Sequence, residues 1–120
     1  SSAADPETGK KYLDMKMYQR SADWFLGVPF NMAQYAMLLS AMAQTTDRTP
    51  RKFIHTFGSA HIYKNHIEQV NEQLGRRNDL YDPPQLKINP DVKNIGDFEA
   101  DDFQIIDYTS HSSIRAQVAI

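Results

Sequence analysis

Cysteine is absent from this chain of 120 residues, although five methionines are present. Without cysteine, the polypeptide forms no disulfide and offers no thiolate to a metal ion. It also has no thiol of its own to act as a nucleophile. Covalent chemistry through sulfur at any site in this chain therefore needs a cysteine from elsewhere.

The chain also lacks a basic excess and a long apolar segment. Its 13 Lys and Arg residues are outnumbered by 15 Asp and Glu residues, which gives a net charge of −2. A general nucleic-acid-binding protein carries a basic stripe, so we do not expect DNA as a partner. No apolar run approaches the roughly 18 residues that a membrane helix needs, and no signal-peptide pattern is present. We therefore expect a cytoplasmic protein without a membrane partner.

What is present is typical of one globular domain. Hydrophobic residues make up 41% and charged residues 23% of the chain, and 120 residues suit a single domain over residues 1–120. Residues 1–11 are rich in turn formers, including Asp5, Pro6 and Gly9, and are expected to form a loop or a hairpin tip. Because the chain starts with Ser1 rather than Met, we expect it to be one part of a longer protein.

Hydrophobic periodicity predicts a mixed order of strands and helices. Strands are expected at residues 12–18, 53–57, 85–89 and 103–108, and helices are expected at residues 32–45 and 62–74. Asn31 is expected to be the N-cap of the first helix, and Gly58 is expected to end the second strand. This order places the chain in the α/β class, with a mixed β-sheet.

The segment at residues 32–45 is apolar on almost every side. An amphipathic surface helix shows a polar stripe, so this segment is predicted to be a buried central helix packed on the mixed β-sheet. Its methionines, Met32, Met37 and Met42, are interpreted as core residues that fill irregular gaps. One buried helix on a four-stranded sheet leaves apolar surface uncovered. We therefore expect a partner, either a second copy of the chain or an N-terminal part.

Residues 19–31 join a cluster of polar and charged residues to an apolar turn. Arg20 and Ser21 offer a guanidinium fork and a hydroxyl, which suit phosphate oxygens. The Asn31 amide both donates and accepts, so it can read a base edge such as O4 and N3–H of uracil. Asp23 can accept from a ring that carries donors, such as a pterin. The alternative interpretation is a surface salt bridge between Arg20 and Asp23, with Asn31 serving only as a cap.

Three histidines, His55, His61 and His66, are candidate ligands. His61 and Tyr63 follow a predicted strand, and their side chains can bind a sugar hydroxyl or can simply begin a helix as satisfied polar aromatics. His61 and His66 are five residues apart, whereas zinc ligands on one helix face need a separation of three or four. His55 lies within a predicted strand and has no obvious ligand partner. We therefore expect no metal.

Four blocks of the sequence carry long and specific motifs. They are Tyr18-Gln19-Arg20-Ser21-x-Asp23-x-x-Leu26-Gly27-x-Pro29-Phe30-Asn31 with Tyr35-Ala36-x-Leu38; Phe53-Ile54-His55-Thr56-Phe57-Gly58 with Ala60-His61-Ile62-Tyr63-x-Asn65-His66; Leu86-x-Ile88-Asn89-Pro90-Asp91; and Ala116-x-Val118-Ala119-Ile120. In this order the blocks resemble the thymidylate synthase family. The resemblance covers nearly the whole chain, from about Leu13 to Ile120.

The resemblance implies the C-terminal portion of a thymidylate synthase-like fold and a homodimer. It also implies the reductive methylation of dUMP to dTMP, with 5,10-methylenetetrahydrofolate as the co-substrate. In that reaction a cysteine thiolate adds to C6 of the uracil ring, which makes C5 nucleophilic. The implied ligands are therefore dUMP and folate, and no metal takes part.

The resemblance also implies a role for each matching residue. Arg20 and Ser21 would hold the phosphate, Asn31 would read the uracil edge, and Gln19 would line the nucleotide site. His61 and Tyr63 would bind the 3′-hydroxyl, and Asp23 would bind the pterin and help proton transfer. Leu26, Gly27 and Phe30 would pack on folate, and Ala119 with Ile120 would close over it. Arg20, Asp23 and Asn31 are thus the implied catalytic residues. For the apolar tail, simple docking on the body is the alternative.

The sequence departs from the family pattern at its start. The family's cysteine precedes the Gln-Arg-Ser motif by a spacing that reaches back to Ser1 or just before it, so the chain alone is expected to be inactive. Ser59 stands where the family usually has Asp, and residues 109–113 lack the usual prolines. Two alternatives remain: a deoxyuridylate hydroxymethylase of the same superfamily, and a non-catalytic nucleotide-binding module of the same fold.

Overall fold

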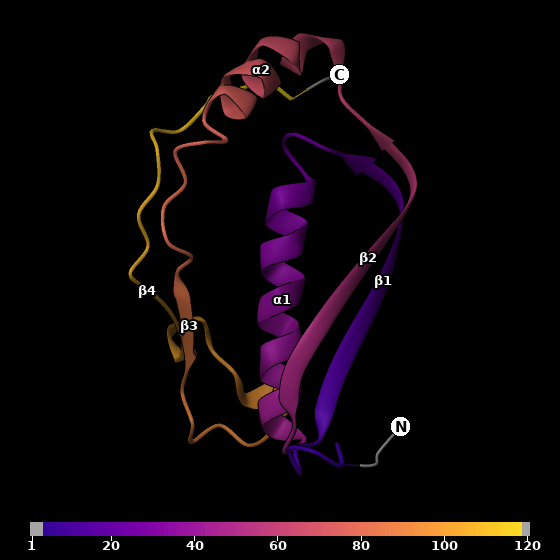
Figure 1. Cartoon of the computed structure of the whole chain (residues 1–120), viewed down its shortest axis with the longest axis vertical. Helices are drawn as coiled ribbons and strands as arrows, with labels where there is room; N and C mark the ends of the chain where they lie inside the picture. The colour runs from indigo at the N-terminus through magenta and orange to yellow at the C-terminus, as the bar shows by residue number, and fades with distance from the viewer. Residues whose placement is uncertain (1–3, 119–120) are drawn as a thin grey trace.

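The computed structural model of the chain describes residues 4–118 (Figure 1). Its elements follow in the order β1 (Tyr12–Asp23), α1 (Val28–Thr45), β2 (Thr49–His61), the 3-10 helix η1 (Lys64–His66), α2 (Ile67–Gly75), β3 (Gln85–Ile88), the 3-10 helices η2 (Ile95–Asp97) and η3 (Ala100–Asp102), and β4 (Phe103–Ile106). The α/β class is therefore confirmed. Within residues 4–118 no helix is long and apolar enough to cross a membrane.

β1 and β2 form a parallel two-stranded ribbon that runs along α1 (Figure 1). Parallel neighbours need a crossover connection, and α1 provides it. Along β1, Leu13, Met15 and Met17 are half-buried and Asp14 is exposed, so the predicted alternation of faces is confirmed. β1 continues to Asp23, beyond its predicted end, because the polar second half of the strand keeps pairing with β2.

β3 and β4 pair with each other in antiparallel fashion. In Figure 1 they lie on the opposite side of α1 from the β1–β2 ribbon. Parallel and antiparallel pairing are thus both present, but they occur in two separate two-stranded sheets rather than in the single mixed sheet that the sequence predicts. The segment after β3 is linked to α1 through Gln44, whose Nε2 donates to the carbonyl oxygens of Asn89 and Val92 at 2.8 and 3.0 Å.

α1 packs one face against the ribbon and leaves other positions open. Leu39 and Ala43 are buried, whereas Met32, Leu38 and Met42 remain 49%, 39% and 37% exposed. The sequence predicts a buried central helix, whereas within the described residues α1 is buried on one face only. The physical reason is that a two-stranded ribbon covers only one side of a helix.

α1 also begins earlier than predicted. The helix starts at Val28 and Gly27 is its N-cap, so the prediction that Asn31 is the N-cap is wrong. A Cβ on Gly27 would lie 3.0 Å from the carbonyl oxygen of Asp23, which explains why the tight turn carries glycine there. Pro29 lies in the first turn, where its missing N–H costs no hydrogen bond. Asn31 is thus one turn inside the helix, and its side chain is not used as a cap.

Gly58 does not end the second strand, because β2 continues to His61. A Cβ on Gly58 would overlap the Tyr18 hydroxyl oxygen and would lie 2.8 Å from the carbonyl oxygen of Arg20. The glycine therefore serves the close approach of β1 rather than a turn. This approach fixes the strand segment that carries Arg20.

The remaining elements follow the predicted order with shifted bounds. The helix predicted at residues 62–74 begins as η1 and continues as α2 to Gly75. The strands predicted at residues 85–89 and 103–108 are β3 and β4, and each ends earlier than predicted. Residues 4–11 form a turn in which Gly9 has φ of 68° and Asp5 Oδ1 accepts the backbone N–H groups of Glu7 and Thr8. Residues 1–3 of the expected loop lie outside the described residues.

Candidate functional site

A hollow of about 320 Å³ opens where the polar half of β1 passes the first turn of α1. Three predicted site residues, Gln19, Arg20 and Asn31, line this hollow together with Tyr35 and two neighbours on β1. The structure thus brings together the guanidinium group predicted to bind a phosphate and the amide predicted to read a base edge.

Gln19 links β1 to both neighbouring elements. Its Nε2 donates to Oδ1 of Asn31 on α1 at 3.2 Å, and its Oε1 lies 2.8 Å from Nε2 of His55 on β2. Because Asn31 Oδ1 accepts from Gln19, the Nδ2 group of Asn31 remains as a donor. The amide side of the hollow is therefore fixed by two successive hydrogen bonds.

Asp23 ends β1 and holds the turn that leads into α1. Its Oδ1 accepts the backbone N–H groups of Phe25 and Leu26 at 2.9 and 3.2 Å, as in an Asx turn. Among residues 4–118, Arg20 takes part in no ion pair, so the alternative of a salt bridge between Arg20 and Asp23 is wrong. The exposed Arg20 guanidinium is available for an anion.

His61 lies beside Asp23 at the carboxyl ends of the two parallel strands, and Tyr63 follows two residues later. His61 is the register partner of Asp23, and Ser21 is opposite Ser59. The rings of His61 and Tyr63 meet edge to face with 4.9 Å between centroids. Tyr63 also immediately precedes η1, as the helix-start interpretation expects. In the described part of the chain, no group of three or more His, Cys, Asp or Glu side chains is arranged to hold a metal ion.

A larger and more apolar hollow, of about 490 Å³, lies between the start of α1, the end of α2 and the C-terminal tail. Leu26, Phe30 and Arg77 line it, together with Arg76, which forms an ion pair with Glu72. Gly27 lies in the turn between the two predicted folate residues. The structure therefore places Leu26 and Phe30 at one apolar surface, apart from the hollow that holds Asn31.

The described part of the C-terminal tail docks on the body of the chain. The fully buried His66 donates through Nε2 to the carbonyl oxygen of Gln117 at 2.7 Å. Arg76 Nη1 donates to the carbonyl oxygen of Ser112 at 2.7 Å. Ala119 and Ile120, which are predicted to close over folate, lie outside the described residues.

Sequence reasoning missed His55 as a member of the site. His55 is held between the rings of Phe53 and Phe57, with centroid distances of 5.4 and 4.0 Å. The spacing of these residues along a strand was a usable signal, because every second residue faces the same side. The pairing of His55 with Gln19 on the neighbouring strand could not be predicted, since the register of parallel strands is set by tertiary contacts.

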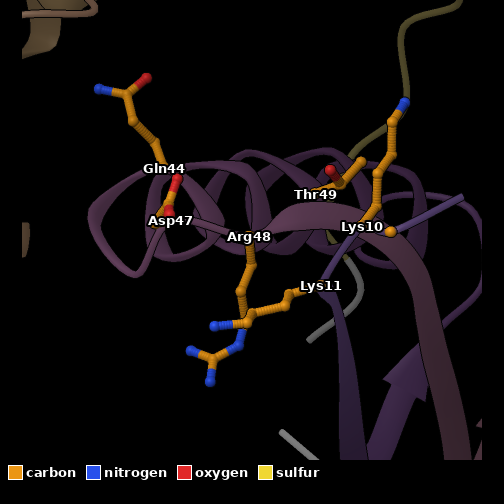
Figure 2. A pocket seen from close by; sticks show the side chains of 7 residues that line it. Lys10, Lys11, Gln44, Asp47, Arg48 and Thr49 are labelled. Carbon is orange, nitrogen blue, oxygen red and sulfur yellow. The ribbon is translucent and has the colours of Figure 1, made fainter. Parts of the chain in front are cut away.

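Another hollow, of about 480 Å³, lies at the far end of α1 (Figure 2). Its lining contains Lys10, Lys11 and Arg48. In Figure 2 the side chains of Lys11 and Arg48 extend to the same side, whereas Lys10 extends away from them. The three positive charges do not converge on one point, so we assign no ligand to this hollow.

The comparisons with known proteins agree on one family. A family model described as thymidylate synthase matches residues 3–120. A thymidylate synthase from Mycoplasma mobile is 52% identical over 108 residues, which is 90% of this chain and 37% of that protein. A thymidylate synthase from Malacoplasma penetrans is 50% identical over 111 residues, which is 92% of this chain and 38% of that protein. The chain thus spans less than two-fifths of the length of these relatives.

Proposed function

The chain belongs to the thymidylate synthase family, and we propose that it supplies the dUMP-binding and folate-binding part of such an enzyme. The proposed reaction is the reductive methylation of dUMP to dTMP. The co-substrate, 5,10-methylenetetrahydrofolate, supplies both the one-carbon unit and the hydride when it is bound. The observation that carries this proposal is the hollow in which Gln19, Arg20 and Asn31 meet.

Each group at the hollow has a distinct proposed task. The Arg20 guanidinium, which forms no ion pair within residues 4–118, holds the phosphate of dUMP with help from the hydroxyl of Ser21. Asn31 presents Nδ2–H to the uracil edge, because its Oδ1 already accepts from Gln19. His61 is the last residue of β2, Tyr63 follows it with its ring against that of His61, and the two bind the 3′-hydroxyl of the deoxyribose.

The apolar hollow fits the co-substrate. Leu26 and Phe30 offer apolar contact to an aromatic ring, and the exposed Arg77 suits a carboxylate that folate carries at its far end. Asp23 uses Oδ1 for the turn, so we assign the pterin donors and the proton-transfer role to its Oδ2. These groups position the folate against the nucleotide and hold a proton near the reacting ring.

The thiol nucleophile must come from outside this polypeptide, because the chain has no cysteine. We propose that it comes from the portion of the family's length that this chain does not span. The apolar side of α1, with Met32, Leu38 and Met42 exposed, is the surface against which that portion packs. A homodimer through the sheet is the further assembly that we propose. The chain by itself then binds ligand without turnover.

Titration calorimetry with dUMP tests the nucleotide site in the chain as it stands. We expect Arg20→Ala to weaken dUMP binding by about tenfold or more, since it removes charge-assisted hydrogen bonds to the phosphate. Lys16→Ala is the matched control, because it removes an exposed cation from the same strand outside the hollow. A wild-type chain that binds no dUMP, or equal losses in both variants, would overturn the proposed nucleotide site.

A second candidate function is a nucleotide-binding module that takes part in no catalysis. The complete lack of cysteine is the observation that favours it. This candidate predicts dUMP binding that depends on Arg20, together with no dTMP formation after the rest of the family's length is supplied. Measuring dTMP in such a reconstituted mixture separates the two functions.

A further inference from the structure

We propose that His55 is a positioning residue that sets the direction of the hydrogen bonds at Asn31 and thereby favours a pyrimidine with a carbonyl at C4. This inference rests on the proposed nucleotide site. His55 does not line the hollow, so it acts through Gln19 rather than by touching the nucleotide.

The connection crosses three elements by two hydrogen bonds. His55 Nε2 on β2 lies 2.8 Å from Gln19 Oε1 on β1, and Gln19 Nε2 lies 3.2 Å from Asn31 Oδ1 on α1. A carboxamide has one end that only accepts and one end that only donates. Once the hydrogen bond at one end of this series is fixed, the orientation of each following amide is therefore fixed as well.

The direction follows from the chemistry of each atom. Gln19 Oε1 can only accept, so His55 must carry its proton on Nε2 and donate it. Gln19 Nε2 then donates to Asn31 Oδ1, and Asn31 Nδ2 is left to donate into the hollow. A donor at this place suits O4 of uracil, whereas it opposes the 4-amino group of cytosine, which is itself a donor.

The surroundings of His55 favour this tautomer. Its Nδ1 is buried and has no hydrogen-bond partner within residues 4–118. A proton at Nδ1 would therefore be a buried donor without an acceptor, which is unfavourable. The rings of Phe53 and Phe57 pack beside the imidazole, whose Nε2 lies 2.8 Å from Gln19 Oε1. The tautomer with Nε2–H is thus the one that satisfies the most groups.

Two substitutions separate the hydrogen bond from the packing. His55→Phe keeps an aromatic ring between Phe53 and Phe57 but has no donor. His55→Gln can place a donor near the position of Nε2. Circular dichroism establishes that each variant is folded, and calorimetry measures dUMP and dCMP binding by the full chain.

We expect His55→Phe to weaken dUMP binding by about tenfold, as for the loss of one well-formed hydrogen bond, and to reduce the preference for dUMP over dCMP. His55→Gln should recover most of that preference. Unchanged affinity and preference in a folded His55→Phe variant would overturn the inference and leave the nucleotide site standing. Equal weakening for both nucleotides without rescue by Gln would also overturn it, because packing alone would then explain the effect.

A readout without nucleotide keeps the inference separate from the proposed function. Long-range proton–nitrogen NMR spectra of the chain report which ring nitrogen of His55 carries the proton. We expect the proton on Nε2. A proton on Nδ1 would overturn the inference, whatever the chain binds. A wild-type chain that binds neither nucleotide would overturn the proposed function, and the preference assigned to His55 with it.

Discussion

Replacing Gly58 with alanine tests how tightly β1 and β2 approach beside the candidate site. The new Cβ would overlap the Tyr18 hydroxyl oxygen and would lie 2.8 Å from the carbonyl oxygen of Arg20. Tyr18 is 66% exposed, so its ring can swing aside at little cost. The backbone carbonyl of Arg20 is held in the ribbon and cannot move as freely.

The steric cost of Gly58→Ala therefore comes mainly from the Arg20 carbonyl. We expect the free energy of unfolding to fall by about 1–3 kcal/mol, the usual range for overpacking. Urea denaturation followed by circular dichroism measures this change. Adding Tyr18→Ala should recover only part of the loss, because the contact with the carbonyl remains.

Gly75→Ala provides the control for this substitution. Gly75 ends α2 and has no atom within 4 Å of an added Cβ, so alanine there should stabilise the chain by about 0.4–1 kcal/mol. The reasoning is refuted if Gly58→Ala is as stable as the wild type, or if Tyr18→Ala restores all of the lost stability.

Three further predictions concern contacts elsewhere in the fold. Gln44→Ala removes both hydrogen bonds to the backbone of residues 89–92 and should lower the free energy of unfolding by about 1–3 kcal/mol in urea denaturation. His66→Phe removes the hydrogen bond that docks the tail. Relative to the wild type, amide hydrogen exchange should therefore become faster at residues 111–117 and should change less in β1. The backbone N–H of Glu99 donates to the Asp102 carboxylate and holds its pKa below the usual value of 3.8. The stability that this hydrogen bond contributes is present above pH 3.8 and should be lost as the pH falls through the lowered pKa. Measuring the free energy of unfolding as a function of acid pH checks this loss.

The elements that could be predicted from the sequence are those fixed by local pattern. The alternation along β1 gave Leu13, Met15 and Met17 as the inward positions, because strand periodicity depends only on neighbours in the chain. The order of strands and helices followed for the same reason. The family resemblance was confirmed by the match over residues 3–120.

The errors arose where tertiary contacts override local signals. Gly58 is a turn former by composition, but the close approach of Tyr18 and Arg20 from the neighbouring strand explains its presence. Asn31 has the composition of an N-cap, yet Gly27 takes that place because the turn from Asp23 is tight. Neither contact is visible in the order of the residues alone.

The apolar composition of α1 predicted burial that the described chain does not provide. Met32 and Leu38 remain 49% and 39% exposed. The apolar pattern of α1 thus exceeds the burial that residues 4–118 provide. In the same way, Gln19, Arg20 and Asn31 were found as neighbours at one hollow, whereas their roles toward dUMP stay predictions.

The most direct test of the central claim measures dTMP. The chain is mixed with dUMP, 5,10-methylenetetrahydrofolate and the remaining portion of a related thymidylate synthase, which we propose as the source of the cysteine. We predict that dTMP forms in the mixture, that neither part alone produces it, and that Arg20→Ala in this chain abolishes it. A folded complex of the two parts that forms no dTMP, or one whose dTMP formation is indifferent to Arg20→Ala, would contradict the account.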